Sequence, residues 1–433
     1  MKVAFSTLGC RVNVYESEAM AEKFIREGYE VVEPSEVADV YVINTCTVTN
    51  MGDKKSRQII SKSRRLNEDA TIAVVGCYSQ MAPQEVSEIP GVDVVLGTRN
   101  KGDVVYYVNK ARDEGKSQVH VEPVIKNKKF EDLNIQEYQD KTRAFLKIQD
   151  GCNRFCTYCI IPYSRGSVCS KDPRKVMEEV KKLAEHGFKE VILSGIHTAS
   201  YGLDLEGKIT LIDLIEDIEN IEGIERIRIG SIEPAFFTKE VIEKMKTFKK
   251  LCPHFHLSLQ SGCDSTLKRM NRRYTAAEYK AAVELLRETM PDVSITTDVI
   301  VGFPGETEEE FKETFDFLED IKLTKTHIFK FSPRKGTRAE NMTGQLDGNV
   351  KDKRSKILMD LNKKNESDFN KKFLGRELDV LFEGNIRNGL AEGYAPNYIK
   401  VQVPSNGLDL SGKILKVKII EALEETVLGE ILK

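Results

Sequence analysis

Three cysteines that fall within eight residues constrain this chain more than any other feature. Spacers of three and of two residues separate Cys152, Cys156 and Cys159. These loop cysteines lie on one short segment, where three thiolates can share one inorganic centre. With three thiolate ligands, a four-iron cluster keeps one iron open to bind a small molecule. A structural zinc ion is the alternative, although it requires a fourth protein ligand and none follows at zinc-finger distance.

The residues around the loop cysteines resemble the cofactor loop of the radical S-adenosylmethionine methylthiotransferases. The resemblance rests on Asn153, Thr157, Tyr158, Pro162, Arg165 and Gly166. In that superfamily the open iron chelates the amino and carboxylate groups of S-adenosylmethionine. Reduction of the cluster then cleaves the sulfonium and releases a 5′-deoxyadenosyl radical. The resemblance therefore implies a [4Fe-4S] cluster and S-adenosylmethionine as cofactors.

The composition narrows the class of protein. At 433 residues the chain is long enough for two or three domains. It holds no apolar run near eighteen residues and no long apolar signal core, so we expect neither a transmembrane helix nor export. Nine cysteines without export indicate metal binding or reactive thiols in a reducing compartment, and we expect a cytoplasmic protein.

The first third of the chain alternates apolar runs with amphipathic stretches. We expect strands at 2–7, 39–44, 71–76 and 92–97, and helices at 17–27 and 53–65. Continuous runs of Val and Ile between helices are typical of parallel strands that are buried on both faces. The predicted fold class is therefore α/β, and it begins with a doubly wound parallel-sheet domain at 1–125.

Three further cysteines directly follow three of these strands. Cys10 comes after the first strand, Cys46 after the second and Cys77 after the third. Doubly wound sheets bind ligands at the carboxyl ends of their strands, so these edge cysteines should meet on one edge. One such cysteine alone would be uninformative, because free cysteine is commonly buried. Three at equivalent places predict a second three-thiolate site.

This part of the chain also resembles the amino-terminal domain of the methylthiotransferases. The resemblance covers Thr7-Leu8-Gly9-Cys10, Asn13, Glu16-Ser17, Asn44-Thr45-Cys46 and Gly76-Cys77, in the family's order. In that family the three equivalent cysteines hold an auxiliary [4Fe-4S] cluster, whose open iron is thought to carry the sulfur that is inserted. The resemblance implies that one S-adenosylmethionine supplies the methyl group and a second supplies the radical.

The central third opens a series of strand–helix units. We expect strands at 144–149, 190–194, 226–230, 255–260, 293–301 and 327–331, with helices such as 173–186 and 276–288 between them. Six consecutive units predict a partial (β/α)6 barrel of parallel strands. We place this radical S-adenosylmethionine domain, with a basic connecting helix, at 140–372, after a polar connection at about 110–142.

The carboxyl-terminal rim of that barrel is the expected active face. The family resemblance favours S-adenosylmethionine contacts at Gly195, Ser231, Glu233 and Gln260. The alternative is that these residues are ordinary turn glycines and polar loop residues. His197 lies on the same rim and we predict no role for it. Three other cysteines match no cluster motif, and we interpret them as structural thiols: Cys169, Cys252 and Cys263.

From about residue 374 the pattern changes to short β-rich runs, at 377–382, 399–403 and 413–421. This domain, 374–433, resembles the small TRAM β-barrel, which binds RNA. Seven Lys and Arg stand against nine Asp and Glu there, so RNA contact would depend on their arrangement, and a packing module is the alternative. The basic segments 54–65 and 351–373 are solvated helix faces by default, and phosphate contacts if the substrate is RNA.

Members of this family modify isopentenyl-adenosine in tRNA, threonylcarbamoyl-adenosine in tRNA, or an aspartate of a ribosomal protein. The segments Asn44 to Asn50 and Asp53 to Gln58 resemble the threonylcarbamoyl-adenosine subfamily. The implied function is insertion of a methylthio group at adenine C2 beside the tRNA anticodon. The implied partners are tRNA and a low-potential electron donor such as flavodoxin or ferredoxin, with no membrane partner. A non-catalytic RNA-binding metalloprotein is the alternative from another class.

Overall fold

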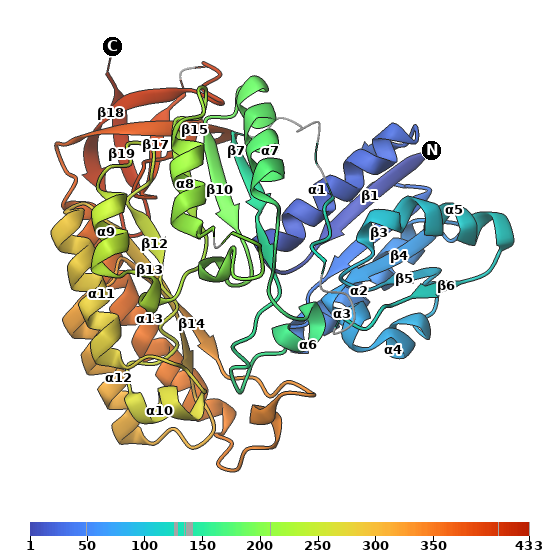
Figure 1. The fold of residues 1–433 in the computed structure, drawn as a ribbon, viewed down its shortest axis with the longest axis horizontal. Coiled ribbons are helices and arrows are strands. Elements are labelled where there is room, and N and C mark those ends of the chain that lie inside the picture. Colours follow the sequence, from blue (N-terminus) through green and yellow to red (C-terminus); the bar gives the residue numbers. More distant parts are fainter. Residues whose placement is uncertain are drawn as a thin grey trace.

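The structure is a computed structural model that describes the chain except at residues 49, 125–128, 134, 136–141, 208, 406 and 433. The predicted domain boundaries at 125, 140 and 433 lie outside the described residues. Residue 49, in the segment that resembles the threonylcarbamoyl-adenosine subfamily, also lies outside them. Figure 1 shows an α/β sheet region at the amino terminus, a larger α/β region in the middle and a β-barrel at the carboxyl terminus.

The amino-terminal region is the parallel sheet that the sequence predicts. Its strands pair in the order β2-β1-β3-β4-β5-β6, and every pair is parallel. The strands are β1 (Lys2–Thr7), β2 (Glu30–Val32), β3 (Val40–Thr45), β4 (Thr71–Gly76), β5 (Val94–Leu96) and β6 (Gln118–His120). The central strands β3 and β4 are buried along their full length, as their continuous apolar sequences require.

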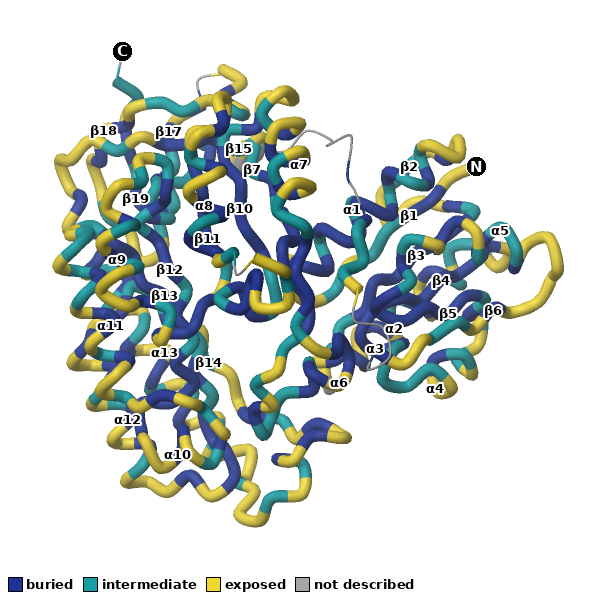
Figure 2. Tube along the Cα trace, in the orientation of Figure 1, coloured by how far each residue is buried: buried dark blue, intermediate teal, exposed yellow. Residues whose placement is uncertain are grey.

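Helices cover both faces of this sheet, so it is doubly wound as predicted. They are α1 (Arg11–Arg26), α2 (Asn50–Leu66), α3 (Cys77–Met81), α4 (Pro83–Ser87) and α5 (Val104–Glu114), with the 3-10 turn η1 (Lys101–Asp103). Met20 and Phe24 of α1 pack with α5 against one face. Ile60 of α2 and Val86 of α4 pack against the other face. Figure 2 shows the central strands β3, β4 and β5 as the buried layer between these helices.

One sequence expectation for this region is wrong in part. The segment 110–142 was expected to be an interdomain connection, but α5 continues to Glu114 and β6 pairs with β5. Such a short edge strand carries too few residues for an apolar pattern to show. The same reason explains why the sequence did not predict β2, which has three residues.

The middle region contains the six predicted parallel strands. They form two sheets, β11-β10-β7 and β12-β13-β14, which are joined by bridges between Ile227 and Leu251 and between Ile232 and Leu257. The strands are β7 (Arg143–Lys147), β10 (Glu190–Ser194), β11 (Arg226–Ile229), β12 (His254–His256), β13 (Ser294–Val301) and β14 (Lys325–Lys330). This arrangement is the expected partial barrel.

Helices surround the outside of the barrel strands (Figure 1). They are α7 (Pro173–Glu185), α8 (Leu211–Glu219), α9 (Lys239–Met245), α10 (Asp264–Arg269), α11 (Ala276–Thr289), α12 (Glu308–Ile321) and α13 (Gly348–Lys371). Shorter elements complete the rim: β8 (Gln149–Asp150), α6 (Ile161–Arg165), β9 (Cys169–Ser170), η2 (Thr198–Ser200), η3 (Pro234–Phe236) and η4 (Arg338–Asn341). The largest apolar core of the described residues lies between the strands and these helices.

The carboxyl-terminal region is a closed barrel with the strand order β15-β16-β17-β19-β18. Its strands are β15 (Glu377–Arg387), β16 (Leu390–Tyr394), β17 (Lys400–Pro404), β18 (Ile414–Ala422) and β19 (Val427–Ile431). The sequence predicted β15, β17 and β18 but not the short strands β16 and β19. Phe369 and Phe373, at the end of α13, pack into the core of this barrel. No helix in the described part of the chain is long and apolar enough to cross a membrane.

Candidate active site

The loop cysteines follow the first barrel strand, β7, and the short strand β8, and they lie on a tightly closed loop. Gly151 begins the loop with φ of +70°, and a Cβ there would lie 2.0 Å from the carbonyl oxygen of Ser167. The N–H of Cys152 donates to the carbonyl of Gly166 at 3.0 Å and so joins the two ends of the loop. Phe155 has φ of +50°, a strained left-handed conformation for a residue with a side chain. This backbone fixes the loop cysteines locally.

The thiols of the loop cysteines are sheltered and influence one another. Cys156 is buried, whereas Cys152 and Cys159 are half-buried. Burial, together with the nearby thiol of Cys156, raises the pKa of Cys152 to about 11 and that of Cys159 to about 12. These two thiols therefore hold their protons at neutral pH, and a metal that binds to them must displace those protons.

Glu233 connects the cysteine loop to the barrel rim. Its carboxylate pairs with Nη2 of Arg154 at 2.6 Å, Nε2 of His197 at 3.1 Å and Nη2 of Arg272 at 3.4 Å. Burial opposes ionisation of Glu233, but the hydrogen bond from His197 and the charges of Arg272 and Arg154 lower its pKa to about 2. Arg272 also donates from Nη1 to Sγ of Cys156 at 3.3 Å. The ionised carboxylate of Glu233 is thus linked to Cys156 through the side chain of Arg272.

The other predicted rim residues lie where barrel strands end. Gly195 follows β10, and a Cβ there would lie 2.8 Å from Oε1 of Gln149. Ser231 is exposed just beyond β11. Gln260, beyond β12, is buried and has φ of +73°, a conformation that residues with side chains rarely adopt. These residues therefore lie on the rim where the sequence predicts them, while their contact with S-adenosylmethionine stays a prediction.

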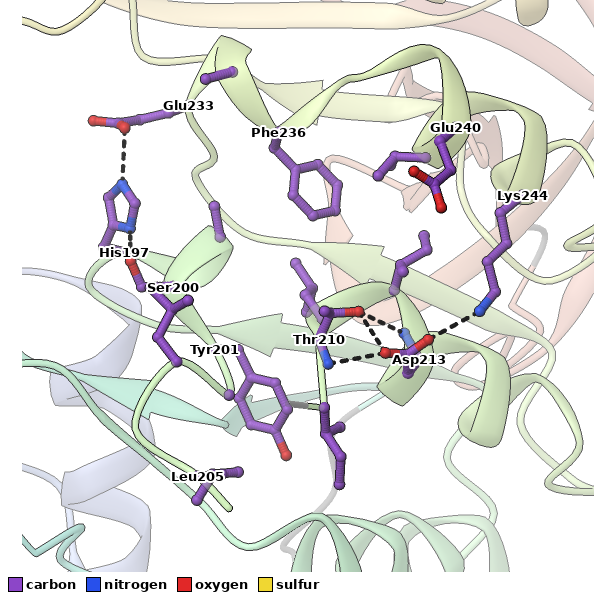
Figure 3. A pocket seen from close by; sticks show the side chains of 18 of the residues that line it. His197, Ser200, Tyr201, Leu205, Thr210, Asp213, Glu233, Phe236, Glu240 and Lys244 are labelled. Carbon is purple, nitrogen blue, oxygen red and sulfur yellow. Dashed lines mark hydrogen bonds and ion pairs between the residues drawn. The ribbon is translucent and has the colours of Figure 1, made fainter. Parts of the chain in front are cut away.

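A pocket of about 820 Å³ opens beside Glu233 (Figure 3). His197 stands between Glu233 and Ser200, because its Nδ1 lies 2.5 Å from Oγ of Ser200 while its Nε2 faces the carboxylate. On the opposite wall, Nζ of Lys244 pairs with Oδ1 of Asp213 at 3.0 Å. His197, for which we predicted no role, is thus a wall residue that positions Glu233. The signal in the sequence was its place two residues after Gly195.

The edge cysteines lie on one edge of the sheet as predicted, because β1, β3 and β4 are neighbours. Cys10 precedes α1, Cys46 follows β3, and Cys77 is the first residue of α3 directly after β4. Gly9 has φ of +99°, and a Cβ there would lie 2.6 Å from Cβ of Cys46. The edge cysteines can therefore approach one another only because residue 9 has no side chain.

The thiols of the edge cysteines also lie within reach of one another's charge. Burial, together with the nearby thiols of Cys77 and Cys10, raises the pKa of Cys46 to about 11. Burial likewise raises the pKa of Cys10, and the charge of Arg165 opposes that rise. Arg165 lies on α6, directly behind the loop cysteines in sequence. A residue of the barrel region is therefore close to the edge cysteines.

Arg165 is the centre of a buried ionic network between the two regions. Its side chain is fully buried. Nη1 lies 3.0 Å from Oε1 of Glu16 and 3.1 Å from Oδ1 of Asp150, and Nη2 donates to Oδ1 of Asn13 at 2.6 Å. Asn13 in turn donates to the carbonyl of Leu8 at 2.7 Å, beside Cys10. The two motifs on which the family resemblance rests are thus in direct contact.

Lys147 and Lys101 complete this network. Lys147 lies 2.8 Å from Glu16 and 2.7 Å from Asp150, and Lys101 pairs with Glu16. Burial alone would raise the pKa values of Glu16 and Asp150, but the charges of Arg165 and the lysines hold both pKa values below their ordinary range. The network therefore stays ionised although water does not reach it.

Both sets of cysteines fit iron–sulfur clusters by the chemistry of their donors. Cysteine thiolates are the ligands of such clusters, and each set supplies three. Within the described residues, no three Cys, His, Asp or Glu side chains converge closely enough to hold a single metal ion. A four-iron cluster binds each thiolate through a different iron atom, so its ligands stand farther apart than those of one zinc ion.

Comparison with known proteins gives the family. Three family models match: the Radical SAM superfamily at 146–318, the Uncharacterized protein family UPF0004 at 2–97 and the TRAM domain at 371–432. Threonylcarbamoyladenosine tRNA methylthiotransferase MtaB of Bacillus subtilis is 43% identical over 97% of this chain and 94% of its own length. The protein of the same name from Aquifex aeolicus is 41% identical over 97% and 100%.

This chain belongs to the MtaB-like radical SAM methylthiotransferases. It is therefore a transferase, and its radical SAM domain takes S-adenosylmethionine and a [4Fe-4S] cluster. A more distant relative, the tRNA-2-methylthio-N(6)-dimethylallyladenosine synthase of Clostridium tetani, is 37% identical over 98% of this chain and 95% of its own length.

Solved structures support the same fold. The radical S-adenosylmethionine methyltransferase TsrM of Kitasatospora setae, solved with cobalamin and a [4Fe-4S] cluster bound, superposes with a TM-score of 0.59. The match covers 78% of this chain and 77% of TsrM at 15% sequence identity, so it concerns the fold alone.

Three cysteines belong to neither set, and our interpretation of them as structural thiols stays a prediction. Cys169, Cys252 and Cys263 are all buried. Cys169 accepts a hydrogen bond from Nη1 of Arg99 at 2.8 Å, and Arg99 also lies 3.9 Å from Asp150. Cys169 thus borders the buried ionic network, which the sequence did not indicate. The structural role of the other two stays a prediction.

Proposed function

We propose that this methylthiotransferase inserts a methylthio group at adenine C2 of threonylcarbamoyl-adenosine, on the 3′ side of the tRNA anticodon. The observation that carries the proposal is the 43% identity, over nearly the full length, to a threonylcarbamoyladenosine tRNA methylthiotransferase. The TRAM domain match at 371–432 supports RNA as the partner. A tRNA substrate fits the expected cytoplasmic location.

In this proposal the two sets of cysteines have different tasks. The loop cysteines hold the radical-generating cluster, and the edge cysteines hold a second, sulfur-delivering [4Fe-4S] cluster. When bound, the clusters and S-adenosylmethionine supply the radical, methyl and sulfur chemistry that an unactivated adenine C–H bond requires, while the protein supplies position and electrostatics. A low-potential donor such as flavodoxin or ferredoxin supplies electrons, since iron–sulfur potentials extend down to roughly −700 mV.

The rim residues would bind and orient S-adenosylmethionine. Glu233 is suited to the amino group because it is ionised and held by three basic partners. Gln260 is suited to ribose hydroxyls because it is a polar side chain buried at the rim. Ser231 and the backbone at Gly195 complete the predicted contacts.

A cavity of about 710 Å³ supports a substrate site between the edge cysteines and the predicted cofactor residues of the rim. It is lined by Gly9 and Arg11 beside Cys10, by Ser231 on the barrel rim, and by Tyr398 of the carboxyl-terminal barrel. Substrate in this cavity would lie next to the edge cysteines and to the predicted cofactor site at once. Insertion of sulfur at a carbon activated by a radical needs such a shared place.

The outer face of α2 is suited to the RNA backbone. Four of its basic residues are exposed, and no ion pair engages them among the described residues: Lys54, Lys55, Lys62 and Arg65. The helix begins four residues after Cys46. Phosphate contacts on this face would hold the RNA on the side of the edge cysteines.

The alternative substrate is dimethylallyl-adenosine, because a relative that carries this name is 37% identical to the chain. Mass spectrometry of tRNA nucleosides from cells with and without this protein distinguishes the two. We expect methylthio-threonylcarbamoyl-adenosine to disappear and its precursor to accumulate when the protein is removed. Loss of the methylthio-dimethylallyl nucleoside instead would transfer the assignment, and an unchanged profile would overturn it.

A further inference from the structure

The substrate cavity contains one basic residue that differs from the others in its partners. Four Lys and Arg side chains line it: Arg11, Arg228, Lys325 and Lys400. Arg228 pairs with Glu190 at 2.8 Å, Lys325 with Glu366 at 2.9 Å and Lys400 with Glu392 at 2.8 Å. Arg11 has no carboxylate partner among the described residues.

Aromatic rings, rather than a carboxylate, hold the guanidinium of Arg11. It lies 5.1 Å from the ring centre of Phe145 and 5.9 Å from that of Tyr398, and its Nη2 donates to the hydroxyl of Tyr398 at 3.1 Å. Stacking of this kind orients a guanidinium while leaving most of its N–H groups free. The side chain is also exposed, so it is open to a ligand in the cavity.

The surroundings of Arg11 favour an anion. Arg228 and Arg143 also lie over the ring of Tyr398, at 4.6 and 5.4 Å from its centre. Both arginines are paired, Arg228 with Glu190 and Arg143 with Glu383. The charge that is left unbalanced around this ring in the described structure therefore resides on Arg11.

Arg11 is also placed at the reacting end of the cavity. It is the residue directly after Cys10, and it is the first residue of α1. Arg11 and Gly9 flank Cys10 in the chain and both line the cavity. A group bound by Arg11 is therefore held next to the edge cysteines.

The two substrates under consideration differ in one charged group. Threonylcarbamoyl-adenosine carries the carboxylate of threonine on its N6 substituent, whereas dimethylallyl-adenosine carries only an apolar chain there. A guanidinium is the side chain best suited to a carboxylate, because it can donate two parallel N–H bonds to it.

We propose that Arg11 is the specificity-determining residue that binds the threonine carboxylate of the substrate and so turns adenine C2 toward the edge cysteines. This inference rests on the proposed function, because it names the group of that substrate which the enzyme recognises. A site built for a charged group rejects an analogue that lacks the group, since the guanidinium is then left without its partner.

The test compares two anticodon stem-loop RNAs that differ only in the N6 substituent: threonylcarbamoyl-adenosine or unmodified adenosine. Binding of each RNA to the cluster-loaded enzyme is measured by fluorescence anisotropy, and kcat/KM for methylthio product is measured by mass spectrometry. We expect Arg11→Gln to reduce the preference of wild type for the carboxylate-bearing RNA by about tenfold to a hundredfold, the range of a charged hydrogen bond. Arg11→Lys should retain part of the preference.

Arg26→Gln is the matched control, because Arg26 lies at the other end of α1 and pairs with Glu22 on that helix. It should keep both the preference and the iron content of wild type. If Arg11→Gln weakens the binding of both RNAs equally, or leaves the ratio of their kcat/KM values unchanged, the assignment of Arg11 is wrong while the proposed function stands. If wild type itself does not convert the threonylcarbamoyl RNA, the proposed function and this inference both fail.

Discussion

The loop cysteines and the edge cysteines each supply three thiols, but the chain brings the two sets together in opposite ways. The loop cysteines lie within eight residues, and a strained turn at Phe155 with a glycine at Gly151 closes their loop. The edge cysteines are far apart in sequence and meet because three adjacent parallel strands end together. A local site depends on loop geometry, whereas a topological site depends on the sheet and on whatever covers its edge.

The surroundings of the two sites extend this difference. Around the loop cysteines, Arg272 and Glu233 both come from the barrel region itself. Around the edge cysteines, the buried cation whose charge acts on Cys10 is Arg165, and Arg165 belongs to the barrel region rather than to the sheet region. The edge site therefore needs two regions to be docked, and the loop site needs one.

Removal of each set of thiols should give the largest and most distinct effects. Replacing Cys152, Cys156 and Cys159 by Ala should abolish reductive formation of 5′-deoxyadenosine, because the open-iron cluster loses its ligands. Replacing the edge cysteines by Ala should spare some cleavage of S-adenosylmethionine and abolish sulfur insertion. Both are measured by liquid chromatography with mass spectrometry. Methylthio product from the edge variant would contradict its assigned role.

Loss of Arg165 should have the next largest effect, on stability. Arg165→Met leaves Glu16 and Asp150 buried with one cation fewer, and breaking a buried ion pair in this way costs ~3–5 kcal/mol. We expect a clear fall in the denaturant midpoint and a weaker hold on the iron of the edge site. Arg174→Gln, which removes an exposed pair with Asp172, is the control and should leave the midpoint unchanged. Equal midpoints for the two variants would show that the network does not dock the domains.

A smaller change should distort the edge site alone. Gly9→Ala introduces a Cβ only 2.6 Å from Cβ of Cys46 at a positive φ, so the backbone beside Cys10 must move. Gly28→Ala is a matched control in the same domain, with φ of +80° and no atom within 4 Å of the new Cβ. Both variants bear the backbone strain of roughly 1–2 kcal/mol, and only Gly9→Ala bears the clash.

Iron analysis and formation of methylthio product separate the two variants, while 5′-deoxyadenosine formation reports on the loop site. Gly9→Ala should lose iron and sulfur insertion while it keeps cleavage of S-adenosylmethionine. Gly28→Ala should keep all three. If Gly9→Ala lost cleavage as well, the two sites would not be built as independently as the comparison requires.

The sequence could predict both sets of cysteines, for different reasons. Spacing alone marks the loop cysteines, whereas the edge cysteines require the inference that apolar runs alternating with helices form a parallel sheet. It could not reveal the contact of Arg165 with Glu16, because the pair is 149 residues apart and charge complementarity over such a separation leaves no local pattern. His197 was likewise visible only as a rim residue until its contact with Glu233 was seen.

The smallest expected effect tests how far the loop site depends on its neighbours. Asn271 follows α10 and has φ of +60°. Its Nδ2 donates to the carbonyl of Phe155 at 3.0 Å and so supports the strained turn. Asn271→Gly removes this bond without backbone strain, since glycine accepts a positive φ. We expect a loss of about 1 kcal/mol, the net worth of one such bond, with slower cluster loading and normal cleavage per loaded cluster.

Asn271→Ala removes the same bond and adds strain at φ of +60°, so it should be less stable than Asn271→Gly. Denaturant titration orders the two variants, and iron-loading kinetics tests the loop. Wild-type loading in both would mean that the loop closes through Gly151 and Gly166 alone, which would make the loop site still more local than the edge site.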